Sequence, residues 1–149
     1  MQNSPSAETG KLTLFYRGNE AHSGLDNVAF LSRDRISFVE DAGDTLHAQR
    51  DALDSGYVFD VTTDYSDTSN QPVRWLAEGR DASATIDSAN GGFGKNDGDN
   101  EITGLHVSDG DPGTNGVLGA RAPQLFQGGW RWFYTQQHGD NPTYEVLPS

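Results

Sequence analysis

The carboxyl-terminal stretch reads Trp130-Arg-Trp-Phe-Tyr-Thr-Gln-Gln-His138-Gly-Asp-Asn-Pro-Thr-Tyr-Glu-Val146, and it decides the fold class. Aromatic and β-branched side chains fill residues 130–135 and 143–146, a composition typical of strands. Residues 139–142 between these runs are glycine, aspartate, asparagine and proline, which form turns. The stretch therefore predicts a β-hairpin that holds His138 just beyond a strand end, where all-β proteins often present functional side chains.

Short strand patterns separated by turns continue through the rest of the chain. Alternating or apolar runs predict further strands at residues 11–16, 27–31, 35–39, 56–62, 72–77 and 101–107. The polar residues 32–34 and 64–71 have the composition of hairpin turns, so each should pair the strands on either side of it. Residues 44–53 fit either a short helix or an irregular segment.

The order of these elements predicts one all-β domain that spans residues 1–149. Two segments rich in glycine and aspartate, 87–100 and 108–124, are expected to be long loops. Residues 25–39 and 102–136 share one order of turn, apolar strand, polar turn and alternating strand. With about 40–45 residues in each four-stranded blade, the chain would supply about three blades of a β-propeller. Such a half-propeller would be completed by another half from the same or a different chain.

Composition excludes several classes of partner. The chain has 22 acidic and 10 basic side chains and a formal charge of -12, so it repels nucleic acid and anionic membrane surfaces. It contains no cysteine, which excludes disulfides, thiolate zinc sites and iron–sulfur clusters. Residues 1–10 lack the basic and apolar pattern of an export signal, and the sequence leaves the compartment open.

Carboxylates near the expected strand ends predict a site for a divalent cation. Glu40 and Asp41 close an alternating strand, and Asp26 stands just before another strand. Hard oxygen ligands held on rigid strand ends suit calcium, so we nominate Glu40, Asp41 and Asp26 as metal ligands. The alternatives are a solvated strand end for the first two and an Asx turn at Asp26-Asn27.

Three further residues are candidates for ligand binding, whereas no catalytic residue can be assigned. Asn27 could contact a metal or a phosphate beside Asp26. Arg50 could bind a phosphate through its guanidinium, or form a local salt bridge with a neighbouring aspartate. His138 could be a ligand or a proton carrier, or it could cap the hairpin through backbone hydrogen bonds.

Two other features have weaker functional interpretations. Residues 96–101 have the composition of half a calcium loop without the spacing of an EF-hand, and we expect an ordinary loop. The aromatic residues 130–134 could line a groove, but alternate members of such a strand more often pack in the core.

Two parts of the chain resemble the PhoX-type alkaline phosphatase family and its β-propeller relatives. Asp26-Asn27-Val-Ala-Phe, followed by Ile36-Ser-Phe-Val-Glu40-Asp41, resembles one blade of that family. Ile102-Thr-Gly-Leu-His-Val-Ser-Asp109, with Phe133-Tyr-Thr-Gln-Gln-His-Gly139 and Thr143-Tyr-Glu-Val146, resembles its closing blade. The resemblance implies a secreted or periplasmic β-propeller whose carboxylates hold calcium and iron and which hydrolyses small phosphate esters.

The chain departs from that family in two ways that matter for activity. It has about half of the blades, and it lacks the cysteine that the family uses at its iron site. We therefore expect calcium as the ion for this chain, iron only in a completed assembly, and phosphate-ester hydrolysis only when further blades are supplied. The alternative is a non-catalytic binding or structural module on the same scaffold.

Overall fold

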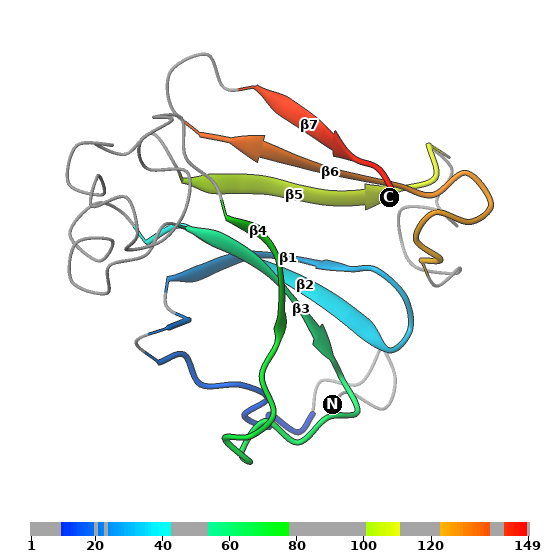
Figure 1. Cartoon of the computed structure of the whole chain (residues 1–149). Coiled ribbons are helices and arrows are strands. Elements are labelled where there is room, and N and C mark those ends of the chain that lie inside the picture. Colours follow the sequence, from blue (N-terminus) through cyan, green and yellow to red (C-terminus); the bar gives the residue numbers. More distant parts are fainter. Residues whose placement is uncertain are drawn as a thin grey trace.

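Two antiparallel sheets face each other in the computed structural model, which describes residues 10–19, 21–22, 24–42, 54–77, 101–110, 123–137 and 142–148 (Figure 1). The strands are β1 (Leu25–Phe30), β2 (Arg35–Glu40), β3 (Ser55–Asp60), β4 (Val73–Ala77), β5 (Ile102–Ser108), β6 (Arg131–Gln136) and β7 (Thr143–Val146). The four-stranded sheet has the order β1-β2-β3-β4, and the three-stranded sheet has the order β5-β6-β7. The all-β prediction is confirmed.

Most of the predicted strands and hairpins are confirmed. β1 pairs with β2, β3 with β4, and β6 with β7, all antiparallel, as the turn residues indicated. The strand predicted at residues 11–16 is wrong, because this segment is described and forms no strand. Phe15 and Tyr16 are consecutive, yet their rings lie 5.9 and 4.8 Å from the same Phe59 ring. Neighbours in a strand point to opposite faces, so this packing requires a different backbone course.

Several predictions fall on residues outside the described ranges. These are the helix or irregular segment at 44–53, the loop at 87–100, and most of the loop at 108–124. The described residues build two sheets, and the count of about three blades stays a prediction. No helix among them is long and apolar enough to cross a bilayer.

Trp75 of β4 packs against the core between the two sheets, whose buried members are Leu31, Val39, Ile102, Leu105, Trp132 and Tyr134. Its ring lies 4.3 Å from the ring of Trp132 and 5.7 Å from that of Tyr134, both of which are buried. The expectation that alternate aromatic residues of β6 pack in the core is therefore confirmed. The Trp75 indole N–H donates to the hydroxyl of Ser37, 3.1 Å away, so its polar atom is satisfied inside the core.

Gly56 makes room for the Trp75 ring. A Cβ atom at residue 56 would lie 2.5 Å from the nearest ring carbon, a distance that packed atoms do not adopt. β4 also has a register shift opposite Gly56 and Tyr57, which accommodates the bulky side chain. The contact of Trp75 with Trp132 and Tyr134 thus depends on a glycine in β3.

A second core covers the outer face of the four-stranded sheet, the face turned away from the three-stranded sheet. It contains Ile36, Tyr57 and Phe59, against which Phe15, Tyr16, Leu25, Phe38 and Tyr65 pack. The amino-terminal segment therefore lies across part of that face, as Figure 1 shows. On the outer face of the three-stranded sheet, the Arg131 guanidinium donates two hydrogen bonds of 2.6 Å to the Glu145 carboxylate and lies 5.6 Å from the centre of the Phe133 ring.

Each sheet has a register shift near the start of its first strand. The shift in β1 lies between Leu25 and Val28, and the shift in β5 lies between Thr103 and His106. Gly104 in the second shift has a φ of +59°, a conformation that glycine adopts without strain. The two irregular segments meet, because the Gly104 N–H donates to the Asn27 Oδ1 at 3.2 Å.

Gly56→Ala should destabilise the protein by about 1–3 kcal/mol, because its methyl group would force the Trp75 ring out of place. Urea denaturation would measure this loss. In a Trp75→Leu background the same change should cost much less, since the obstructing ring is gone. Equal costs in the two backgrounds would contradict the proposed clash.

Candidate functional site

The residues nominated from the sequence lie at the end of the sheets where β1, β3 and β5 begin. Asp26 is in β1, Glu40 ends β2, and Asp41 follows it. Asp54 directly precedes β3 and Glu101 directly precedes β5, and neither was predicted as a site residue. The available signal was position, because both acids adjoin a strand as Glu40 and Asp41 do. We call Asp26, Glu40, Asp41, Asp54 and Glu101 the acidic end.

Two carboxylates of the acidic end are fully buried and bind the main chain. Glu40 is 0% exposed, and its Oε2 accepts a hydrogen bond of 2.9 Å from the Ser55 N–H. The carboxylate of Asp54, also buried, accepts from the Ala42 N–H at 3.0 and 3.2 Å. The alternative of a solvated strand end is therefore wrong for Glu40. Both acids instead connect the end of β2 to the beginning of β3 through these hydrogen bonds.

Asp26 and Asn27 connect with each other and with the second sheet. The Asn27 side-chain amide donates to the Asp26 Oδ2 at 2.6 Å. The Asn27 Oδ1 accepts from Gly104 of β5, as described above. Asn27 therefore joins the two sheets, and these contacts differ from the local Asx turn that we weighed as an alternative.

Asp41 is half-buried and lies in a negative environment. Desolvation raises its pKa above the ordinary value of 3.8, and the Glu101 carboxylate adds to this effect. Asp54 and Asp26 raise the pKa further, and a hydrogen bond from Asp41 to Glu101 acts in the same direction. Two carboxyl groups can share a hydrogen bond only when one of them carries a proton. The hydrogen bond between Asp41 and Glu101 thus links the two sheets, and it requires a proton on one of the two carboxyl groups.

These carboxylates do not form a ready metal site in the part of the chain that the structure describes. Within it, no group of three or more histidine, aspartate or glutamate side chains is arranged to hold an ion. The structure brings Asp26 and Asp41 into electrostatic contact, whereas the Glu40 carboxylate binds the main chain. Arg50 and His138 lie outside the described residues.

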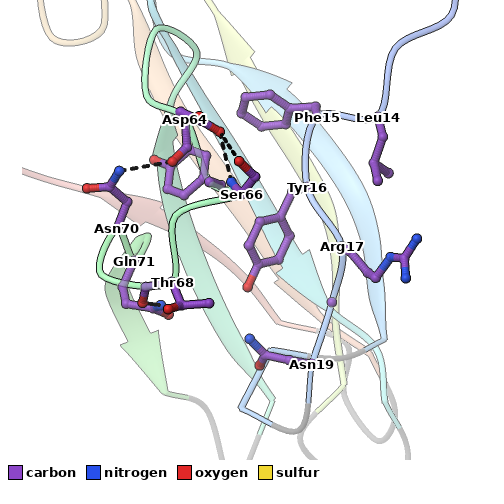
Figure 2. A pocket seen from close by; sticks show the side chains of 12 residues that line it. Leu14, Phe15, Tyr16, Arg17, Asn19, Asp64, Ser66, Thr68, Asn70 and Gln71 are labelled. Atoms are coloured by element: carbon purple, nitrogen blue, oxygen red, sulfur yellow. Dashed lines mark hydrogen bonds between the residues drawn. The ribbon is translucent and has the colours of Figure 1, made fainter.

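A pocket at the other end of β3 was not predicted from the sequence. It has a volume of about 430 Å³ and lies between residues 14–19 and residues 64–71 of the β3–β4 loop (Figure 2). Its aromatic lining consists of Phe15, Tyr16 and Tyr65, and its polar lining includes Asp64, Asn70 and Gln71. The segments are distant in sequence, so no local motif could indicate that they meet.

The loop that forms one wall of the pocket repeats one hydrogen-bonded turn. Asp60, Asp64 and Asp67 are each followed two residues later by a threonine or serine. In all three cases the aspartate Oδ1 accepts from both the N–H and the hydroxyl of that residue, at 2.6–2.9 Å. These bonds lower the pKa of each aspartate, which keeps the loop carboxylates ionised. This repeat was the signal in the sequence for an ordered loop.

Comparison with known proteins found no matching family model, no similar curated protein and no similar solved structure. The resemblance to the PhoX-type family therefore remains a prediction made from the sequence.

The Asp41→Asn variant should be more stable than the wild type at neutral pH. Because the folded pKa of Asp41 is raised, the folded state binds its proton more tightly than the unfolded state. The stability that Asp41 contributes to the wild type is therefore fully present below its unfolded pKa of about 4. This contribution is lost as the pH rises through the folded pKa. Asparagine is neutral and can still donate to Glu101.

Thermal melting of both proteins from neutral to acidic pH would test the direction of this difference in stability. The advantage of Asp41→Asn should shrink as the pH falls toward about 4, where wild-type Asp41 is itself protonated. Asp60→Asn is the control, because hydrogen bonds from Thr62 lower the pKa of Asp60. It should give no stabilisation at neutral pH. A constant difference between Asp41→Asn and wild type would show that the ionisation of Asp41 is not responsible.

Proposed function

We propose that the chain is a non-catalytic binding module built on a propeller-like pair of sheets. The observation that supports this proposal is that the buried carboxylates of the acidic end form hydrogen bonds with the main chain. Glu40 and Asp54 accept hydrogen bonds from main-chain N–H groups at the junction of β2 and β3. Acceptors committed in this way stabilise the scaffold, and the pocket at the opposite end of β3 then offers the site for a ligand.

The proposal that the two sheets are neighbouring blades rests on their shared local structure. Each sheet is an antiparallel meander with a register shift near the start of its first strand. The residue after the second strand of each sheet donates to the residue before the first strand. These bonds run from Asp41 to Gly24 and from Gln137 to Glu101, both at 2.9 Å. A repeated unit that packs face to face with the next one is the principle of a propeller.

The two outer faces favour a further sheet on one side of this pair. On the outer face of the four-stranded sheet, Val28 and Phe30 of the edge strand β1 are 51% and 57% exposed. The outer face of the three-stranded sheet carries the Arg131–Glu145 ion pair instead. Apolar side chains in open water favour association, whereas a paired charge does not. The partner in this proposal is another half-propeller whose sheet covers Val28 and Phe30, and a second copy of the chain could supply it.

The contact between Asp41 and Glu101 favours a second candidate function, a divalent-metal site. Two neighbouring carboxylates attract a cation as well as a proton, and calcium accepts oxygen ligands in flexible arrangements. In this candidate Asp41, Glu101 and Asp26 would contribute oxygens, and further blades would supply the remaining ligands, including those for iron. A metal ion bound there would activate the nucleophile in the hydrolysis of a phosphate ester.

Calcium separates the two candidate functions. For the binding module, millimolar calcium should leave the melting temperature of the wild type unchanged relative to magnesium. A metal site would stabilise the folded state, by about 2.7 kcal/mol at a hundredfold excess over the dissociation constant. That gain should vanish in Asp41→Asn/Glu101→Gln and persist in the loop variant Asp67→Asn. Such a result would support the metal site, and calcium-dependent hydrolysis of p-nitrophenyl phosphate would contradict the non-catalytic module.

The exposed apolar edge can be tested by mass in solution. Light scattering of the purified chain should give a mass above the 16.1 kDa of one copy at high concentration. Phe30→Lys should reduce the mass to that of a single copy, because a charge would be buried in the contact. Leu147→Lys is the matched control, since Leu147 is also an exposed apolar residue but follows β7. Association that survives Phe30→Lys would contradict the assigned face.

A further inference from the structure

We infer that the pocket between residues 14–19 and 64–71 is a binding site for a neutral saccharide, an inference that rests on the proposed binding module. The volume of about 430 Å³ falls within the range of about 300–1,000 Å³ that is usual for small-molecule sites. The lining combines the aromatic rings of Phe15, Tyr16 and Tyr65 with hydrogen-bond acceptors of the 64–71 loop (Figure 2). A pyranose ring has the same two properties, apolar C–H faces and hydroxyl groups around its edge.

The acceptors follow from the hydrogen bonds that the loop already makes. Ser66 occupies the Oδ1 of Asp64 through both its N–H and its hydroxyl. The side-chain N–H of Asn70 donates to the main-chain oxygen of Asp64 at 2.9 Å, and that of Gln71 donates to Thr68 at 2.7 Å. One N–H of each side-chain amide is thus engaged within the loop. This leaves the Asp64 Oδ2 and the amide oxygens of Asn70 and Gln71 without a hydrogen-bond partner in the described part of the chain.

Acceptors of this kind select ligands that donate hydrogen bonds. A carboxylate and amide oxygens cannot bond to each other without a donor between them, and sugar hydroxyls are such donors. The Ser66 bonds hold Asp64 ionised by lowering its pKa, so its bond to a hydroxyl would be charge-assisted. The turns at Asp64 and Asp67 fix the loop before any ligand arrives, which reduces the entropy lost on binding.

The aromatic rings of the pocket are held rigidly because they pack on the outer core. Phe15 and Tyr16 lie 5.7 and 5.8 Å from Tyr65 in edge-to-face contact, and all three rings contact Phe59. The Tyr16 hydroxyl is also 2.6 Å from the His22 Nδ1. Figure 2 shows Phe15 and Tyr16 on the segment that faces Asp64 and Asn70 across the pocket. Their half-buried faces offer apolar surface to a flat, partly apolar ring.

Other ligand classes fit this pocket less well. A quaternary ammonium ion needs aromatic rings spaced around it, whereas these rings touch one another. A phosphate ester would meet the Asp64 carboxylate and a chain of net charge -12. Among the described residues, Arg17 is the one cation that lines the pocket, and its side chain points away from Asp64 in Figure 2. The neutral saccharide avoids both conflicts.

The test is an NMR titration of the ¹⁵N-labelled chain with methyl glycosides of glucose, galactose and mannose and with maltose. At least one of them should shift the amide signals of residues 14–19 and 64–71, with a dissociation constant in the millimolar range or tighter. Choline and p-nitrophenyl phosphate serve as the cationic and anionic comparisons. Shifts caused by none of the sugars, or a stronger response to choline or to the phosphate ester, would overturn the inference.

A pair of matched variants tests the assigned acceptor. Asp64→Asn keeps the Oδ1 that Ser66 uses and replaces Oδ2 with a donor, so the affinity for the sugar should fall about tenfold. Asp67→Asn makes the same change in a neighbouring turn at a residue that does not itself line the pocket, and its affinity should match the wild type. The unbound spectrum of each variant would verify its fold. Equal losses in both variants would overturn the role of Asp64.

These outcomes are separable from those of the proposed function. If calcium leaves the melting temperature unchanged and no glycoside binds, the saccharide inference fails while the non-catalytic module stands. If calcium stabilises the chain through Asp41 and Glu101 and supports hydrolysis of p-nitrophenyl phosphate, the non-catalytic proposal fails even where a sugar binds at the loop. The two sites lie beyond opposite ends of β3, so the variants at one should not alter the other.

Discussion

The contact of β4 with the three-stranded sheet depends on the packing of Trp75 over Gly56. This contact brings β4 against Trp132 and Tyr134 of the other sheet, and the indole N–H is satisfied by Ser37 at the same time. The Trp75 ring lies over β3, its neighbour in the same sheet, and it can lie there because Gly56 has no Cβ atom. Once the sheets are held at this spacing, Asn27 can reach the main chain of β5.

The acidic end is a consequence of that arrangement. The first strands of both sheets begin side by side, so the acids that adjoin them are brought together from distant parts of the sequence. Burying a carboxylate is costly unless hydrogen bonds replace its water, and Glu40 and Asp54 obtain those bonds from the main chain. Asp41 lies beside the Glu101 carboxylate, which helps to raise its pKa and makes their junction a part of the interface that responds to protonation.

The sequence predicted what local chemistry determines. Turn residues and alternation identified β1, β2 and the hairpins, because each of these signals lies within about ten residues. Lys11–Tyr16 has the alternation of a strand, but both of its aromatic rings bind to Phe59 and override that pattern. A pair of acids at a strand end is ambiguous for a similar reason, since metal binding and main-chain capping require the same oxygen atoms. For Glu40 the capping role is visible only in the structure, as the hydrogen bond that its Oε2 accepts from the Ser55 N–H.

The pocket escaped prediction because its two walls meet only after folding. Residues 14–19 reach the β3–β4 loop through the rings that pack on Phe59, a contact that depends on the face of β3 rather than on any motif. β3 therefore separates two kinds of chemistry, with charged groups that join the sheets at its beginning and a rigid polar loop beyond its end. Since the loop is held by its own hydrogen bonds, its surface side chains can change without disturbing the contact between the sheets. Such a separation allows a binding site to diversify on a scaffold whose stability is determined elsewhere.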